Sequence, residues 1–258
     1  MMRWLLPVLL ILTCCAKAAE PQAPRSWCHE QTFEGSRFTV CDNEGGRLEL
    51  FAAGKSDRPL RSFAEVARRI DPSKVAFAMN AGMFDENGRP IGLAAPTHGG
   101  GHPITLKDGP GNFHLKPNGV FLVNIAGTPA IYQSDRIPEF RAAPRLSTQS
   151  GPMLVIAGKL HPKFDADGSS RLIRNGVGVT AHSKALFVIS EDPVSFGKFA
   201  RFFRDVLKTP NALYFDGVVS SLWDPANGRQ DAHAPLGPII VALKPGASGP
   251  DRAGPAKP

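Results

Sequence analysis

Short apolar and β-branched runs, separated by turn residues, recur along the chain and predict a protein built largely on strands. The residues Asn43 to Gly46 between the first two runs predict a hairpin turn. The predicted strands cover residues 37–42, 47–52, 75–79, 119–125, 153–157, 176–180, 185–189 and 212–215.

Two segments have the spacing of helices. Ser62 and Glu65 form a capping box, which predicts a helix that runs to about Ile70. Ser195 is the predicted N-cap of a second helix. Its apolar side chains recur at helical spacing and are expected to face the core: Phe196, Phe199, Phe203, Val206 and Leu207.

These elements predict a mixed α/β (α+β) fold, a single domain with a central mixed β-sheet flanked by a few helices. The chain has 258 residues, of which 42% are hydrophobic, and this is enough to build the core of one domain. Residues 81–117 are rich in glycine and proline and predict a long loop, which in a compact domain is usually functional or mobile. The predicted domain covers residues 19–243, and residues 244–258 predict a disordered tail.

The first 18 residues have the pattern of a signal peptide. Arg3 precedes the apolar run 5–12, and Ala16-Lys17-Ala18 resembles a cleavage site. The run is well short of the ~20 residues of a spanning helix, so we expect a periplasmic or secreted protein without a stable membrane span. A lipoprotein is the alternative, because Leu12-Thr13-Cys14-Cys15 loosely resembles a lipobox.

The number of cysteines agrees with export, and the net charge agrees with an anionic ligand. If Cys14 and Cys15 leave with the signal peptide, Cys28 and Cys41 remain as an even pair and predict a disulfide. The net charge of +7 favours anionic ligands. The basic residues are scattered and rarely alternate with aromatic residues, which argues against a nucleic-acid partner.

The sequence predicts no cofactor. Its histidines form no HxH or HExxH motif, and no Gly-x-Ser-x-Gly motif is present. The segment Asp165–Ser169 resembles the start of a calcium loop without the distal glutamate, so a structural divalent cation is the alternative.

Polar residues interrupt the apolar pattern where predicted strands begin or end. A carboxylate such as Asp216 at the end of a buried strand is costly to desolvate unless it is paired or used. Since ligands bind beyond strand ends, we expect these residues to share one edge of the fold. Turn capping, helix capping and surface exposure are the respective alternatives for Asn80, Glu191 and Arg174. The residues are Asn80, Gln149, Ser150, Arg174, Asn175, Glu191 and Asp216.

Five motifs, in this order, resemble those of the phosphodiester glycosidase family, and in particular its branch of exported bacterial proteins. The resemblance extends from about Cys41 to Leu243. The motifs are Asn80-Ala81-Gly82-Met83-Phe84-Asp85, Lys116-Pro117-Asn118-Gly119-Val120-Phe121, Gln149-Ser150-Gly151-Pro152-Met153-Leu154, residues 170–179, and Phe215-Asp216-Gly217 with Ser220-Ser221.

The resemblance implies a hydrolase that cleaves the bond between the anomeric carbon of a sugar and a phosphate oxygen, in envelope or extracellular glycans. Because phosphate is a stable leaving group, stabilising its negative charge matters more than protonating it. Asp216 and Glu191 are the predicted catalytic carboxylates, and Arg174 is the predicted phosphate clamp. The predicted substrate-binding residues are Asn80, Asn118, Gln149, Ser150, Arg174, Asn175, Ser220 and Ser221.

The chain departs from the family at Ala81, Val218 and Val219, where relatives often have glycine, and at Met83, where they often have phenylalanine. A valine in place of glycine is expected to reshape the floor of the pocket. The expected substrate is a sugar phosphodiester or another anionic glycan, and it is expected to differ from the substrates of the relatives. The alternative function is a non-catalytic module that binds the envelope or a polysaccharide on the same scaffold.

Overall fold

The computed structural model of the chain describes residues 26–54, 57–98, 100–139 and 143–249. The predicted signal peptide and lipobox lie outside the described residues, as does the tail from residue 250 onwards. No helix in the described ranges is long and apolar enough to cross a membrane.

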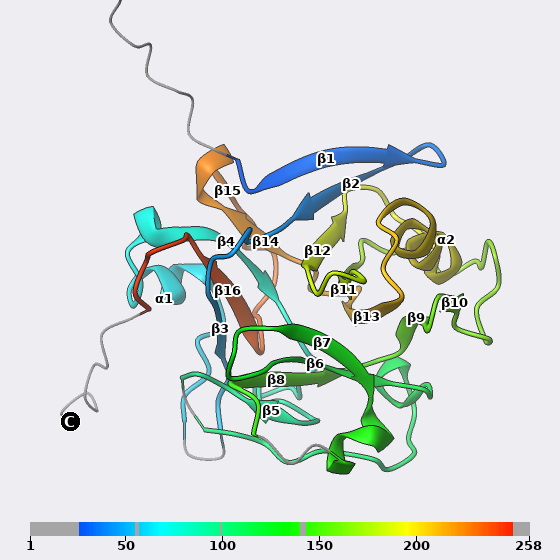
Figure 1. Cartoon of the computed structure of the whole chain (residues 1–258), viewed down its shortest axis with the longest axis horizontal. Coiled ribbons are helices and arrows are strands. Elements are labelled where there is room, and N and C mark those ends of the chain that lie inside the picture. Colours follow the sequence, from blue (N-terminus) through cyan, green and yellow to red (C-terminus); the bar gives the residue numbers. More distant parts are fainter. Residues whose placement is uncertain (1–25, 55–56, 99, 140–142, 250–258) are drawn as a thin grey trace, which may run out of the picture.

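The described residues form three sheets and few helices (Figure 1). Every pair of neighbouring strands described in them is antiparallel. The mixed α+β content agrees with the prediction, but the expectation of one central mixed sheet is wrong. Long-range strand pairing decided the number of sheets, and the local apolar pattern carries no information on it.

The largest sheet has seven strands, in the order β1 (Cys28–Phe33), β2 (Ser36–Cys41), β12 (Ala185–Ser190), β11 (Asn175–Val179), β13 (Asn211–Asp216), β9 (Met153–Ile156) and β10 (Lys159–Leu160). The second has the order β15 (Arg229–Gln230), β14 (Leu222–Asp224), β4 (Val75–Asn80), β16 (Ile239–Leu243) and β3 (Leu48–Phe51). The third has the order β5 (Ala94–Ala95), β8 (Leu146–Ser150), β6 (Gly119–Val123) and β7 (Pro129–Gln133).

The predicted hairpin around Asn43–Gly46 is wrong. β2 pairs with β1 and β12, whereas β3 pairs with β16 in another sheet. The actual hairpin joins β1 to β2 through Glu34 and Gly35, which both have positive φ, as a two-residue hairpin turn requires. The polar sequence of β1 concealed this strand, because only its pairing with β2 makes it one.

Both predicted helices are present. In α1 (Phe63–Ala67), the Ser62 hydroxyl accepts a hydrogen bond from the Glu65 amide at 3.2 Å. In α2 (Phe196–Arg201), Ser195 caps the first turn in the same way. A π-helical turn, η4 (Phe202–Val206), follows α2 and changes the residue register, so Val206 is 38% exposed instead of facing the core. Short 3₁₀ turns complete the set: η1 (Pro72–Lys74), η2 (Asn112–His114), η3 (Ser134–Glu139) and η5 (Pro225–Asn227).

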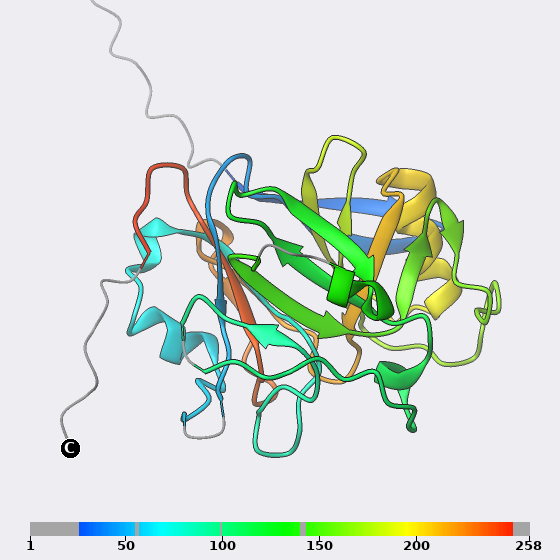
Figure 2. The ribbon, with the colours of Figure 1, turned by 60° about the horizontal axis from the view of Figure 1, so that its bottom comes forward.

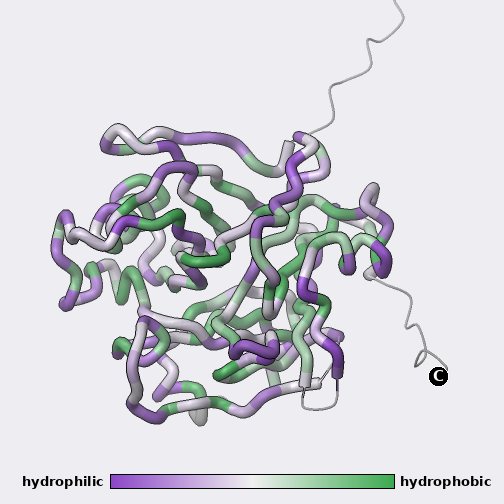
Figure 3. The backbone as a smooth tube through the Cα atoms, turned by 180° about the vertical axis from the view of Figure 1, so that it is seen from behind, coloured by the Kyte–Doolittle hydropathy of each residue, from purple (hydrophilic) through white to green (hydrophobic). Residues whose placement is uncertain are grey.

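The hydrophobic core lies between the sheets and under α2. Phe77, Phe121 and Phe187 meet where all three sheets pack together. The aromatic side chains of α2 and η4 pack on the other face of the seven-stranded sheet, against Phe38 and Tyr214. Figure 2 shows the four-stranded sheet lying across the front of the molecule, and Figure 3 shows the hydrophobic segments running through the interior.

The predicted disulfide is present. Cys28 and Cys41 pair across the open end of the β1–β2 hairpin, with the sulfur atoms 2.06 Å apart. It therefore ties the first described strand to the sheet.

Candidate active site

Three of the predicted strand-end residues come together between two sheets. Asn175 at the start of β11 lies opposite Asp216 at the end of β13. The Asn175 side-chain amide reaches across to β4 and donates to the backbone oxygen of Asn80 at 2.9 Å and to its Oδ1 at 3.0 Å. Both asparagines are completely buried. Their bonds fix the ends of β4 and β11 against each other.

The two predicted serines complete this network. The Ser220 hydroxyl lies 3.1 Å from Asn175 Oδ1 and also close to the backbone oxygen of Asp216. The Ser221 amide donates to Asn80 Oδ1 at 2.8 Å. Ser150, at the end of β8, donates to the Phe215 backbone oxygen at 3.2 Å. Strand ends from all three sheets therefore meet at this group of residues.

Asp216 organises the turn that follows β13. Its Oδ1 accepts hydrogen bonds from the amides of Gly217 (2.6 Å), Val218 (2.6 Å) and Val219 (3.0 Å). The side chain is partly exposed, and Val218 beside it is 80% exposed. One carboxylate oxygen thus holds the turn, and the carboxylate as a whole sits at the surface end of a buried strand.

Arg174 is completely buried directly below this turn. Its Nε donates to the Val194 backbone oxygen at 2.9 Å, and its Nη2 donates to the Ser170 backbone oxygen at 2.9 Å. Its Nη1 donates to the Tyr214 hydroxyl at 3.1 Å. The guanidinium carbon also lies 3.7 Å from the centre of the Phe196 ring. These contacts lock the guanidinium in one orientation.

The charge of Arg174 has no carboxylate partner within ion-pair distance among the described residues. Burial lowers the pKa of Arg174, while the neighbouring Tyr214 raises it in part. An arginine remains protonated in a protein, so a positive charge is held in the interior. A buried charge without a partner is costly, and this cost is typical of a functional site.

Gly217 brings the turn into contact with the buried pair. A side chain at this position would collide with the Tyr214 hydroxyl, and its Cβ would lie 3.4 Å from Arg174 Nη1. Burial raises the pKa of Tyr214, and the negative charge of Asp216 adds to this rise, whereas Arg174 opposes it. Tyr214 therefore remains a neutral hydroxyl between the guanidinium and the turn.

Glu191 lies in a separate ion-pair network. Its Oε1 accepts from the Thr39 hydroxyl at 2.6 Å and from Arg229 Nη1 at 2.5 Å. Arg229 also binds Asp231, whose Oδ2 accepts from the Leu222 amide at 2.9 Å. Arg229 and Asp231 thus link Glu191 to Leu222, the residue after Ser221. The described hydrogen bonds of Glu191 do not include one to Asp216.

Gln149 and Asn118 hold the long loop 81–117 instead of joining the Asp216 network. Gln149 Oε1 accepts from the amides of Leu93 and Thr105, and its Nε2 donates to the Ser134 hydroxyl. Asn118 donates to the Phe113 backbone oxygen at 2.9 Å. Successive side chains of a strand point to opposite faces, so Gln149 turns away from the edge that Ser150 reaches.

Sequence reasoning missed Tyr214 and Arg229. In the sequence Tyr214 belongs to the apolar run that ends at Asp216, although a period of two places both residues on the same face of β13. Arg229 carries no local signal, because its partners Glu191 and Asp231 meet only in the folded chain.

No group of three or more histidine, cysteine, aspartate or glutamate side chains in the described ranges could hold a metal ion. In the calcium-like segment, Asp167 pairs with Arg171 at 2.7 Å, and the Ala166 backbone oxygen accepts from Arg201. These oxygens thus have protein partners.

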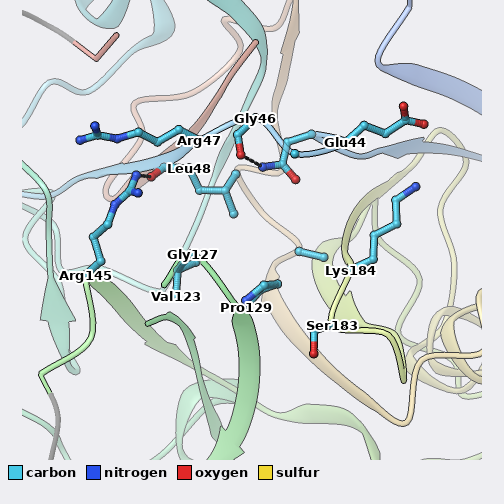
Figure 4. A pocket seen from close by; sticks show the side chains of 13 residues that line it. Glu44, Gly46, Arg47, Leu48, Val123, Gly127, Pro129, Arg145, Ser183 and Lys184 are labelled. Carbon is cyan, nitrogen blue, oxygen red and sulfur yellow. Dashed lines mark hydrogen bonds between the residues drawn. The ribbon is translucent and has the colours of Figure 1, made fainter. Parts of the chain in front are cut away.

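A second polar cluster surrounds the buried Glu49 on β3. Arg47 and Arg145 both approach Glu49 Oε1, and His98 lies 3.1 Å from Oε2. The two arginines also line a cavity of about 320 Å³. This cavity lies at the end of β11 and β12 that is remote from Asn175. Figure 4 shows both arginine side chains extending to the same side of it. Burial alone would raise the pKa of Glu49, but hydrogen bonds from His98 and Thr97 and the charge of Arg47 outweigh it and lower the pKa.

This lowered pKa predicts a loss of stability in acid. The stabilisation is complete above the ordinary pKa of 4.5 and is lost as the pH falls through the lower folded-state value. We expect the Glu49→Gln variant to show a smaller decrease in the free energy of unfolding between pH 5 and pH 3 than the wild type, measured by urea denaturation. Equal decreases in both proteins would contradict this role for Glu49.

Comparison with known proteins identifies the class of the protein. Residues 73–241 match the phosphodiester glycosidase family, and the chain belongs to this family. It is similar to the uncharacterized protein YigE of Escherichia coli (strain K12), with 34% identity over 152 residues. That match covers 58% of each chain, so less than two thirds of the relative's length is matched.

Among solved structures, the fold is similar to the catalytic domain of the zebrafish N-acetylglucosamine-1-phosphodiester alpha-N-acetylglucosaminidase, described as auto-inhibited by its pro-peptide. The TM-score is 0.55 at 13% identity, covering 84% of this chain and 81% of that chain. A hypothetical protein from Synechocystis matches with a TM-score of 0.48 at 16% identity, covering 84% and 61% of the two chains.

Proposed function

We propose that this protein is an exported phosphodiester glycosidase that hydrolyses the bond between sugar C1 and phosphate oxygen in a glycosyl-1-phosphodiester. The observation that carries the proposal is Arg174, a buried cation without a described carboxylate partner, directly below the turn that Asp216 organises. Membership of the family supports the class of reaction.

In the proposed reaction, the substrate lies over the turn that begins at Asp216. The bond from C1 to the phosphate oxygen breaks, and the phosphate leaves with the electron pair. Water supplies the new hydroxyl group at C1, and its other proton passes to the phosphate monoester or to solvent. The Asp216 carboxylate faces C1 as nucleophile, base or stabiliser of the positive charge that develops there. Its Oδ1 is held by three amides, so Oδ2 is the oxygen that acts on the substrate.

Arg174 stabilises the leaving phosphate through its charge. The guanidinium is buried, so its field is weakly screened and acts on an anion bound above Gly217. In this proposal Arg174 works from below the turn, since its bonds to Ser170, Val194 and Tyr214 hold it there.

The asparagine–serine network positions these two groups. Asn80, Asn175, Ser220 and Ser221 fix the start and the end of the turn relative to β4 and β11. Glu191 is proposed as the second carboxylate, held by Thr39 on β2 and Arg229 on β15. Gln149, Asn118 and Ser150 support the loop and strand that border the site. The proposed mechanism uses no cofactor.

The direct test is turnover by the purified wild-type protein. A panel of glycosyl-1-phosphodiesters with different sugars is incubated with it, together with simple aryl glycosides and aryl phosphodiesters for comparison. We expect release of sugar from the glycosyl-1-phosphodiesters and no hydrolysis of phosphodiesters that lack a sugar. Binding without turnover across the panel would favour the alternative of a polysaccharide-binding module.

A further inference from the structure

A small cavity lies between the β1–β2 hairpin and the strands β14 and β15. It has a volume of about 180 Å³. Leu222, the residue after Ser221, is one of the residues that line it. The hairpin and both strands lie next to one another in Figure 1. Its lining consists of Cys28, His29, Glu30, Thr39, Leu222, Asp224, Asn227 and Arg229.

The strand register gives the distance from Asp216 to this cavity. Thr39 lies opposite Ile189, Ile189 opposite Asn175, and Asn175 opposite Asp216. Three strand spacings separate Thr39 from Asp216, which amounts to about 14 Å. A phosphodiester that carries a second polar group beyond its phosphate can span such a distance.

Asp224 supplies the reason to expect a ligand. The residue is 2% exposed, and its Oδ2 accepts from the Asn227 side-chain amide at 2.6 Å. Its Oδ1 is buried and has no hydrogen-bond partner in the described part of the chain. A buried carboxylate oxygen without a donor is costly, so a donor supplied by a ligand in the adjoining cavity would be bound favourably.

The charges around the cavity select the kind of ligand. Arg229 is already bound to Glu191 and Asp231, and no group of three or more histidine, cysteine, aspartate or glutamate side chains in the described part of the chain could hold a metal ion here. The carboxylates of Asp224 and Glu30 disfavour an anion. A hydroxyl group both donates and accepts, so it satisfies both kinds of lining group. The volume equals that of about six water molecules in the liquid, which suits one polyol or one monosaccharide unit.

We propose that this cavity is a subsite for a hydroxyl-rich aglycone, a polyol or sugar esterified to the far side of the phosphate, with one hydroxyl donating to Asp224 Oδ1. The inference rests on the proposed function. The β1–β2 wall of the cavity precedes the residues 73–241 that match the family, so half of the subsite lies outside the shared region.

The experiment compares two substrates in one variant. kcat/KM is measured for a methyl and a glyceryl diester of the same sugar 1-phosphate, and the glyceryl-to-methyl ratio is compared between wild type and Asp224→Ala. We expect the ratio to fall about tenfold or more, the effect of losing a hydrogen bond to a charged group. Glu65→Ala, at an exposed carboxylate on α1, is the control and should keep the wild-type ratio. An unchanged ratio in Asp224→Ala would overturn the inference.

A binding measurement separates this inference from the proposed function. Glycerol is titrated into isotope-labelled wild type, Asp224→Ala and the closer isostere Asp224→Asn, and the amide resonances of Leu222 and Asn227 are followed by NMR. Saturable shifts in the wild type that are lost in Asp224→Ala support the subsite even if no phosphodiester is turned over. Absence of saturable shifts in a wild type that hydrolyses both diesters with equal kcat/KM would overturn the subsite and leave the proposed function standing.

Discussion

The Asp216→Asn variant is expected to lose release of sugar from glycosyl-1-phosphodiesters by a factor on the order of 10³ or more. Asparagine removes the negative charge that faces C1 in the proposed reaction. Its side-chain oxygen can still accept from the amides of Gly217, Val218 and Val219, so the turn should persist. We therefore expect the melting temperature to change little while kcat/KM collapses.

The measurement is steady-state kinetics on the best substrate of the panel, with thermal denaturation on the same preparations. Asp108→Asn is the matched control, because Asp108 is 91% exposed and pairs only with Lys116 among its described ion pairs. It should retain wild-type kinetics. Unchanged turnover in Asp216→Asn would remove Asp216 from the catalytic machinery.

The second large effect is expected for Arg174→Lys. Lysine keeps a positive charge, but it cannot reproduce the planar fork that bonds Val194, Ser170 and Tyr214 while stacking on Phe196. The charge then leaves its place below Gly217, and we expect kcat/KM to fall about 100-fold, mainly through kcat.

Stability should fall as well, because at least one buried acceptor loses its donor, at a cost of about 1–3 kcal/mol. Kinetics are therefore measured at a temperature at which circular dichroism shows the variant to be folded. Arg171→Lys is the control in the same segment, since Arg171 is exposed and pairs with Asp167. Wild-type kinetics in Arg174→Lys would show that the buried charge takes no part in the reaction.

Burying the charge of Arg174 costs folding free energy, and the proposed reaction gives this buried charge a function. Folding buries its charge against hydroxyl groups, carbonyl groups and an aromatic ring, without a described carboxylate to compensate it. A carboxylate in this position would make the protein more stable, but it would also cancel the field above Gly217. An anionic substrate can supply the missing negative charge at the moment of binding.

The local pattern of the sequence predicted most of the strands that form the site. β4 and β13 each end in a polar residue after an apolar run, and β11 begins with a polar residue before one, so Asn80, Asn175 and Asp216 could be singled out from that pattern. Both helix caps were also predictable, since a cap depends on residues only three positions apart.

The features that the sequence did not reveal depend on distant partners. Three sheets formed instead of one because β2 and β3, which are neighbours in the chain, pair in different sheets. Glu191 contacts Arg229, 38 residues away, and this pairing decides its surroundings. The direction of Gln149 depends on the face of β8 from which it projects.

In the proposed reaction the bond between C1 and the phosphate oxygen is the one that breaks, and hydrolysis in ¹⁸O-labelled water identifies the broken bond. The products of a glycosyl-1-phosphodiester are separated, and the label is located by mass spectrometry before the released sugar exchanges with solvent. We predict that ¹⁸O is found at C1 of the sugar and that the phosphate monoester is unlabelled. Label in the phosphate would mean cleavage of a phosphorus–oxygen bond and would contradict the proposed reaction.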